Sequence, residues 1–565
     1  NKFAASEAVF GSSTIHPIPD IDNTDFLLIF GANPRVSHMS FISIADPMES
    51  LRAASKRGAD IRFVDPRHNE SIKGIGTHVP VKPDTDVYLM AAILHHLFDQ
   101  NMVNHEYIQD HADHIEGLRS FIDEYSPQQV ANVVGISAQS IEALANDIGA
   151  AKSAAFYMST GVNMGRQGSL AYWLLFMLSV VTGNLDKPGG NVYSRGFYPA
   201  AKAGRLQGEV KYEPTPLGDV RRIRGSLPGN LMADMILSED NPIKGLIVIS
   251  GNPILSMGSG EKLQRAFEQL EFVMVIDIYP SATSEYADYV LPATDMFERA
   301  DINICGLGMQ KEPFIQYTDF IVPPKAERRP EWWILRQIEL AQGFATENRE
   351  LDDYQGAIDG LGLFSRFDHM LRQSNLSIDD VKSSGTVLLN PVAPGKFFSN
   401  VIQTESSRVD CMPASFDEAI GRCRELFDEL GREPEDQLKM ISRRTNYMIN
   451  SWFHNVPSLK RPKHQNNPLY VHPDDARARN LGEGSSVTVR NEFGEIKTVV
   501  ALDESLKPGT VAITHGWGYP GKTMKTAAKF AGSNANNLLP SGPGSFEKIS
   551  NQSFMTGIKV EVEAA

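Results

Sequence analysis

The stretch Phe26-Leu-Leu-Ile-Phe-Gly-Ala-Asn-Pro34 decides the fold, because five consecutive apolar residues end there at a glycine. A short apolar run stopped by Gly31 is typical of a buried parallel strand. A second strand is predicted at 61–64, where it ends in Asp65-Pro66-Arg67, and a helix is predicted from 84 to about 98. Strands that alternate with helices indicate an α/β fold with a mainly parallel sheet.

The same features return later in the chain in the same order, which predicts two related α/β units. An apolar strand at 246–251 leads into a second glycine-asparagine-proline, and a strand at 272–276 ends in an aspartate. Neither unit has the G-x-G-x-x-G fingerprint, which argues against a simple nicotinamide dehydrogenase. The corresponding positions are offset by 220, 212 and 209 residues: Gly31 and Gly251, Asp65 and Asp277, Thr85 and Thr294.

The C-terminal part has a different pattern, with short alternating segments separated by glycine turns. Residues 486–490 and 496–500 alternate around a hairpin turn, and further short strands are predicted at 511–513 and 558–562. Many short strands of this kind indicate a β-barrel. We therefore expect three domains: an α/β unit at 1–235, a second at 236–440 and the barrel at 441–565.

Composition excludes several classes of protein. The 565 residues carry a formal charge of −15, which disfavours binding to nucleic acid or to anionic membranes. The longest apolar run, 170–181, is too short to cross a bilayer, so no direct membrane insertion is expected. The three cysteines, Cys305, Cys411 and Cys423, form no C-x-x-C pair, so this chain by itself cannot hold a four-cysteine cluster. So few cysteines favour a reducing compartment, and we expect a cytoplasmic protein.

Several polar residues lie where α/β sheets bind ligands, at the carboxyl ends of strands. Asn33 and Asn252 place an amide at that edge, and Asp65 or Asp277 suits ribose hydroxyls or the donor edge of guanine. Alternatively, these residues serve only to form turns. The polar, glycine-punctuated stretch at 159–166 precedes a predicted helix, whose N-terminus suits an anionic group. His454, His472 and His515 lack the spacing of a zinc site, so we predict no protein-held metal there.

Taken together, these motifs resemble the large catalytic subunits of molybdopterin oxidoreductases, the dimethyl-sulfoxide-reductase superfamily. The resemblance runs from about residue 20 to the C-terminus, with 344–440 the loosest stretch. The barrel is similar to that superfamily's molybdopterin-dinucleotide-binding domain. The matching sequence motifs are Gly31-Ala-Asn-Pro34, Val64-Asp-Pro-Arg67, Thr182-Gly-Asn-Leu185 with Lys187-Pro-Gly-Gly190, Gly251-Asn-Pro253, His454-Asn455, His472-Pro473, His515-Gly516 and Asn537.

The resemblance implies two molybdopterin guanine dinucleotides, one on each Rossmann-like unit, with molybdenum or tungsten between the pterins. It assigns to the first dinucleotide Gly31, Asn33, Pro34, Asp65, Arg67 and Asp86, with Gly161 and Asn163 near the pterins. It assigns to the second Gly251, Asn252, Pro253, Asp277, Thr283 and Asp288, and it lets the barrel close over both with His454, Asn455, His515, Gly516 and Asn537.

The chain also departs from the family pattern. The usual N-terminal four-cysteine motif is not found, so a [4Fe–4S] cluster is expected only if an upstream region supplies it. The family's metal ligand usually lies shortly before the segment that matches residues 20–33. Ser6, Ser12 and Ser13 are the candidates within the chain, but the spacing places the expected ligand upstream of Asn1. Lys244 is a weak candidate for a charged group near the metal, and a solvated surface lysine is the alternative.

These expectations define a molybdenum or tungsten oxidoreductase that transfers an oxygen atom or a hydride, with two electrons, on a small substrate. An electron-transfer partner subunit is a further expectation. One alternative keeps the fold without the cofactor, as a structural subunit of a redox complex. Another is a non-redox hydratase on the same scaffold, which turnover without an electron acceptor would reveal.

Overall fold

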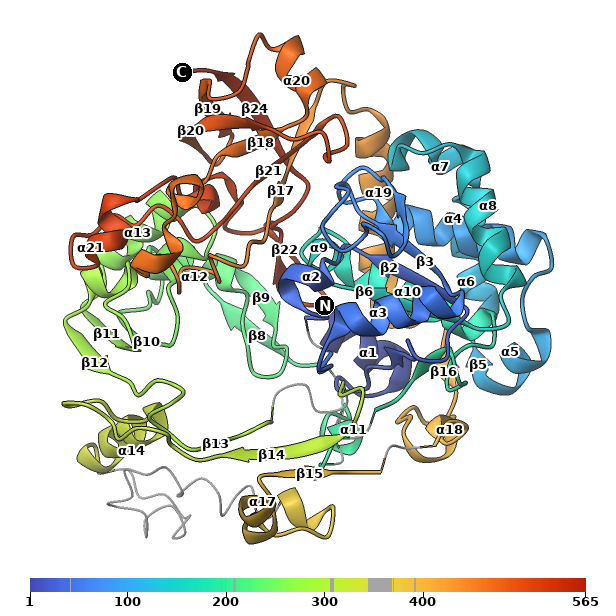
Figure 1. Ribbon diagram of the computed structural model, residues 1–565, viewed down its shortest axis with the longest axis horizontal. Coiled ribbons are helices and arrows are strands. Elements are labelled where there is room, and N and C mark those ends of the chain that lie inside the picture. The colour runs from blue at the N-terminus through green and yellow to red at the C-terminus, as the bar shows by residue number, and fades with distance from the viewer. Residues whose placement is uncertain are drawn as a thin grey trace.

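The computed structural model describes residues 1–40, 42–194, 196–198, 200–206, 210–304, 309–343, 368, 370–390 and 393–565. Cys305 lies outside these residues. Figure 1 shows one α/β unit on the right, a second on the left, the barrel above them and a small sheet below. The two α/β units therefore face each other beneath the barrel.

The first unit is built on a parallel four-stranded sheet in the order β4-β3-β2-β6. Its central strand β2 (Phe26–Phe30) is buried along its whole length, as the apolar run predicts. Alternate side chains of β2 face opposite ways: Leu27 and Ile29 join one core with α3 (Pro47–Arg57), and Leu28 joins the other with α4 and α10. The remaining bounds are β3 (Asp60–Val64), β4 (Thr77–Val79), β6 (Ala154–Met158), α4 (Asp86–Asp99), α8 (Ala138–Ala150) and α10 (Gly168–Val181).

The second unit repeats this arrangement with the parallel strands β10 (Gly245–Ile249), β11 (Phe272–Asp277) and β12 (Tyr289–Pro292). The backbone matches closely: Gly31 N–H donates to Val64 at 2.9 Å, and Ser250 N–H donates to Ile276 at 2.9 Å. Gly31 has φ 53° and Ser250 has φ 52°. The structural counterpart of Gly31 is therefore Ser250 and not Gly251, and the offset of this pair is one residue shorter than the sequence motif indicated.

Six strands form the closed barrel predicted for the C-terminal part, in the order β17-β21-β18-β20-β19-β24. Alternate residues such as Val487, Val489 and Ile496 fill its interior, which explains the period-two pattern of the sequence. The bounds are β17 (Leu438–Ser442), β18 (Leu469–Val471), β19 (Ser486–Asn491), β20 (Gly494–Leu502), β21 (Thr510–Ile513) and β24 (Ile558–Ala564).

Residues 393–431 do not follow the predicted boundary of 236–440, because they pack on the first unit. β16 (Val409–Asp410) pairs with β5 (Ala112–Asp113), and α19 (Asp417–Gly431) places Cys423 in the same core as α4 and α10. The amphipathic pattern of α19 predicts a helix, but it cannot say which unit the helix covers. The segment between the second unit and this return forms the small sheet β13 (Asp301–Ile302), β14 (Phe314–Thr318) and β15 (Thr386–Leu388).

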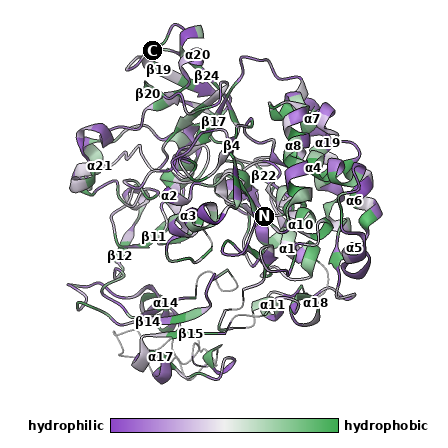
Figure 2. Cartoon of the chain, turned by 45° about the vertical axis from the view of Figure 1, so that its right-hand side comes forward, coloured by the Kyte–Doolittle hydropathy of each residue, from purple (hydrophilic) through white to green (hydrophobic). Residues whose placement is uncertain are grey.

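Helix α10 explains the longest apolar run of the chain. Every residue of α10 is buried, and Figure 2 shows hydrophobic residues gathered where the helices of the first unit lie together. Across the described residues, no helix has both the length and the apolar character that a membrane crossing requires. The run at 170–181 is thus a core helix.

We predict that Trp173→Ala lowers the free energy of unfolding by about 3–5 kcal/mol. Trp173 is fully buried on α10, and its indole N–H donates to the Cys411 carbonyl at 3.0 Å, so it joins the returning segment to the first unit. Denaturant unfolding measures the change. Trp452→Ala is the matched control, because Trp452 is 42% exposed; equal losses for both variants would contradict this packing.

Candidate functional site

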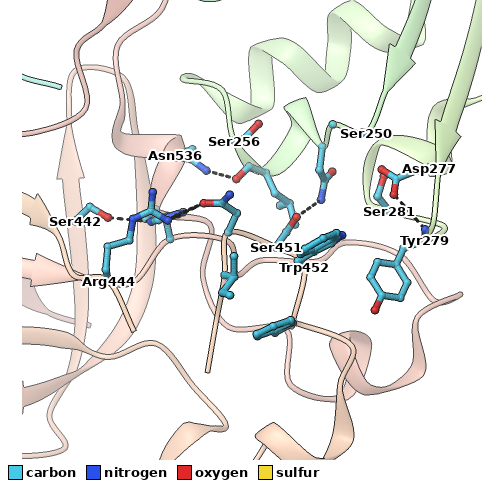
Figure 3. Close-up of a pocket in the computed structure, with 18 of the residues that line it drawn as sticks. Ser250, Ser256, Asp277, Tyr279, Ser281, Ser442, Arg444, Ser451, Trp452 and Asn536 are labelled. Atoms are coloured by element: carbon cyan, nitrogen blue, oxygen red, sulfur yellow. Dashed lines mark hydrogen bonds between the residues drawn. The ribbon is translucent and has the colours of Figure 1, made fainter. Parts of the chain in front are cut away.

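A cavity of about 940 Å³ lies where the carboxyl ends of the second unit's strands meet the barrel (Figure 3). The first unit contributes Thr160, Gly161 and Met164 to its wall. All three domains therefore meet at this cavity. The polar residues that line it include Ser250, Asn252, Asp277, Ser281, Thr294, Arg299, Glu331, Ser442, Arg444, Asn450, Ser451, His515, Asn536 and Thr556.

The amide of Asn252 ties the second unit to the barrel loop that covers it. Its Oδ1 accepts from the Thr283 hydroxyl at 2.9 Å and from the Thr283 backbone N–H at 3.2 Å. Its Nδ2 donates to the Ser451 hydroxyl at 2.9 Å. Asn252 is therefore satisfied at both ends and positions Ser451 at the edge of the sheet.

An acidic group marks one end of the cavity. Asp277 ends β11, and its Oδ1 accepts from the Tyr279 N–H at 3.2 Å. Burial raises the pKa of Asp277 above its ordinary value. The hydroxyl of Thr294 is buried nearby in the cavity wall, and within the described chain it has no hydrogen-bond partner. This end presents both a carboxylate and an unused hydroxyl.

A cationic group marks the other end, on the barrel side of Figure 3. The Arg444 guanidinium donates to Asn450 Oδ1 at 2.7 Å and contacts His515 Nε2 at 3.1 Å. Burial and the neighbouring Arg444 lower the pKa of His515 to about 4, so the imidazole is neutral at pH 7. We assign its proton to Nδ1, 2.9 Å from the Ser442 hydroxyl, because a guanidinium can only donate to Nε2.

The matching edge of the first unit is internally hydrogen-bonded. Asn33 Oδ1 accepts from the Ser71 hydroxyl at 2.6 Å, and its Nδ2 donates to Glu70 at 2.6 Å. Arg67 donates two bonds to the same carboxylate, at 3.1 and 2.8 Å. Burial opposes ionisation, but the bonds from Arg67 and Asn33 lower the pKa of Glu70 to about 2. Burial raises the pKa of Asp65 to about 6 and that of Asp86 to about 7.

Two glycines bring the loop at 159–166 against the first strand end. The Gly161 N–H donates to the Gly31 carbonyl at 3.0 Å, and a Cβ on Gly161 would lie 2.7 Å from that oxygen. Beyond this contact, both amide atoms of the buried Asn163 are without a partner in the described structure. An unsatisfied buried amide is costly, so Asn163 fits a ligand that supplies both a donor and an acceptor.

Several predicted residues have local structural contacts. Pro34 and Pro253 are the first residues of the short helices after β2 and β10. His454 is fully buried, with Nε2 at 3.0 Å from the Phe530 carbonyl. Asn455 accepts from the Thr526 N–H at 3.0 Å. Gly516 has φ 84° and lies against the Asn450 backbone, while Asn537 Oδ1 is buried with no partner in the described chain.

Two predicted residues lie at the wrong end of the second sheet. Asp288 accepts from the Val273 N–H at 2.8 Å, and Lys244 is an exposed residue that pairs with Glu271 at 2.8 Å. Both contacts are at the amino ends of strands, whereas the cavity lies at the carboxyl ends. Neither residue lines the cavity, because a parallel strand separates its two ends by its full length.

The serine hydroxyls of the N-terminal segment are engaged elsewhere. Ser6, Ser12 and Ser13 donate to the backbone carbonyls of Ile15, Ala201 and Gly204, at 2.6, 2.6 and 3.2 Å. His472 accepts from the Asp474 N–H at 3.2 Å and caps α20 (Pro473–Ala478). Over the described ranges, no group of three or more histidine, cysteine or acidic side chains is placed to hold a metal ion.

The sequence reasoning missed Glu70, Ser71, Arg444 and Ser451. Ser71 follows Asp65 by the same interval as Thr283 follows Asp277, so the internal duplication contains the signal that would find it. The Arg35 N–H donates to Ser71 at 2.9 Å, and the Ile254 N–H donates to Thr283 at 3.4 Å in the same way. Arg444 has no such counterpart, and only the folded chain brings it to the cavity.

Comparisons with known proteins agree on one family. The family described as Molybdopterin oxidoreductase matches residues 3–340, and the Molydopterin dinucleotide binding domain matches 438–552. The probable oxidoreductase YoaE of Bacillus subtilis is 23% identical over 88% of this chain and 70% of its own length. The F420-dependent formate dehydrogenase subunit alpha of Methanocaldococcus jannaschii is 25% identical over 89% of this chain and 74% of its own.

A solved structure has the same fold. Acetylene hydratase from Pelobacter acetylenicus superposes with a TM-score of 0.79, covering 100% of this chain and 81% of its own, at 17% identity. At that identity the likeness establishes the arrangement of the α/β units and the barrel, and it carries no conclusion about the reaction.

We predict that His454→Gln removes a pH-dependent loss of stability. Burial lowers the folded-state pKa of His454 to about 4, below the unfolded value of about 6.5. The unfolded chain therefore takes up the proton first, and stability falls as pH drops from about 6.5 to 4. Between these pH values the native chain should lose about 3 kcal/mol more than the variant, in which Gln retains the bond to Phe530. Parallel pH curves would contradict a buried neutral imidazole.

We also predict that Asn252 and Ser451 are energetically coupled. In a double-mutant cycle of Asn252→Ala and Ser451→Ala, the coupling energy should be about 0.5–1.5 kcal/mol, because one hydrogen bond joins the two side chains. Unfolding free energies of the four proteins give the value. Strict additivity of the two substitutions would show that Ser451 is held by other contacts.

Proposed function

The chain belongs to the molybdopterin oxidoreductase family, and we propose on that basis that it catalyses a two-electron oxygen-atom or hydride transfer on a small substrate. Its cofactor is a molybdenum or tungsten ion held by two molybdopterin guanine dinucleotides. The observation that carries the proposal is the polarised cavity between the second unit and the dinucleotide-binding barrel, with Arg444 at one end and Asp277 at the other.

The residues present fit this cofactor. A dinucleotide offers a pyrophosphate, which suits the Arg444 guanidinium. It also offers ribose hydroxyls and the N–H groups of guanine, which suit the Asp277 carboxylate and the unpartnered Thr294 hydroxyl. The pterin ring offers alternating donors and acceptors, which suit the unpartnered Asn163 amide. When bound, the group supplies a metal that changes its oxidation state by two electrons.

The protein's own residues bind and orient. His515 remains neutral, so it fixes the Arg444 guanidinium by accepting from it without adding charge. Asn252 holds Ser451 and the loop beside it over the strand ends. Gly31 and Gly161 allow the first strand end and the loop of Asn163 to touch through their backbones. These contacts pre-organise the walls before a ligand enters.

Two further points belong to the proposal. An electron-transfer partner subunit would complete the redox cycle, and it is supported by the match to a relative whose name describes one subunit of a formate dehydrogenase. A cytoplasmic location is supported by Cys411 and Cys423, which are free, buried thiols. Burial raises the pKa of Cys423 to about 12, so this thiol is un-ionised and unreactive.

We predict that the purified protein, isolated with its cofactor, contains molybdenum or tungsten and releases guanine nucleotide on acid denaturation. Asn163→Leu should lower this content about tenfold or more, because the ligand loses two hydrogen bonds. The same substitution should leave the cofactor-free chain at least as stable as before, since the buried amide has no partner to lose within the described chain. Lys244→Gln is the control and should retain full content. Absence of both metals and of guanine would contradict the proposed function.

A further inference from the structure

Two neighbouring arginines at the end of β17 serve different α/β units. Arg443 forms an ion pair with Asp503 at 2.5 Å and lies 3.9 Å from Glu70 at the edge of the first unit. Arg444 lines the cavity of the second unit and contacts Asn450 and His515. Consecutive side chains of extended backbone point in opposite directions, so one strand end supplies a cation to each nucleotide edge.

The cations of the first edge are already neutralised. Arg67 is paired bidentately with Glu70, and Arg443 is paired with Asp503 and lies 3.8 Å above the Tyr470 ring. Glu70 also takes the amide donor of Asn33. The donors that a phosphate would need at this edge are therefore already bonded to the Glu70 carboxylate. The negative charge of Glu70 also repels the negative charge of the phosphate at this range.

The cation of the second edge is not neutralised in this way. Among the described residues, no carboxylate lies within 4 Å of the Arg444 guanidinium, whose partners are the neutral Asn450 and His515. The position that corresponds to Arg67 is Tyr279, and the position that corresponds to Glu70 is Ala282. The second unit thus has no acidic residue at the position of Glu70. Glu331 also lies at this edge and lines the cavity, but its partner is Arg299, at 2.6 Å, and not Arg444.

We propose that the two dinucleotide sites of this protein are unequal: Arg444 makes the second unit ready to bind a pyrophosphate, whereas Glu70 acts as an internal counterion that a ligand of the first unit must displace. This inference rests on the proposed function, and it adds the order in which the sites engage their ligand. The site on the second unit binds its ligand before the other site does. The site on the first unit binds only after the hydrogen bonds of Glu70 to Asn33 and Arg67 have broken.

The test uses the whole chain, purified without cofactor from a host that cannot make pterin, and GDP as the probe for the guanosine pyrophosphate half. Isothermal titration should show one GDP bound tightly per chain. Arg444→Gln should weaken this binding about tenfold to a hundredfold. Lys244→Gln is the control, since it removes a positive charge from the opposite, amino end of the second unit's sheet, and it should change the dissociation constant by less than about twofold.

Glu70→Gln tests the other half of the proposal, because it keeps the size of the side chain and removes its charge. It should reveal a second GDP site with an affinity within about tenfold of the first. Glu70→Ser is a second variant that removes the charge, and thermal unfolding verifies that each variant is folded.

Three results would overturn the inference: two equal GDP sites or none in the native chain, unchanged binding in Arg444→Gln, or no second site in either Glu70 variant. The metal and guanine content of the cofactor-loaded protein tests the proposed function separately from the inequality of the two sites. If both are present while the GDP asymmetry is not, only the inequality of the sites is wrong.

Discussion

Parallel strand pairing is the constraint on which the rest of this structure depends. It brings the carboxyl ends of β2, β3 and β6 to one edge, and those of β10, β11 and β12 to another. Each edge gathers a glycine- or serine-led turn, an asparagine and an aspartate that are distant in sequence. One strand end of the barrel lies between the two edges: Arg443 lies 3.9 Å from Glu70 at the first edge, and Arg444 lines the cavity at the second.

The repeated backbone carries different side chains, and the difference lies in charge. Asn33 and Asn252 hold the same place after their strands, and a hydroxyl from Ser71 or Thr283 satisfies each Oδ1. Their Nδ2 groups diverge, since one meets the Glu70 carboxylate and the other the neutral Ser451 hydroxyl. A duplicated fold has thus produced one edge closed by its own ion pairs and one edge open to a cavity.

Burial and hydrogen bonding together decide which groups at these edges are ionised. The His515 imidazole is neutral because charging it beside Arg444 in a buried site is unfavourable. Glu70 is ionised in spite of burial, because Arg67 and Asn33 donate to it. Burial raises the pKa of Asp65 to about 6; its donors among the described residues are the Arg67 backbone N–H and the Asn69 amide. The charge pattern that a ligand meets therefore depends on packing as much as on composition.

The sequence by itself determined the parallel strands, the duplicated units, the barrel and the family. Each of these follows from local periodicity or from short sequence motifs in a constant order, such as the apolar run that ends at Gly31 and the asparagine-proline pair that follows it. Only the tertiary structure decided that residues 393–431 cover the first unit, that Lys244 and Asp288 lie away from the cavity, and that Arg444 lies in it. Those facts depend on contacts between segments that are far apart in the sequence. A local sequence pattern predicts a helix or a strand, but it does not predict which other segment that element packs against.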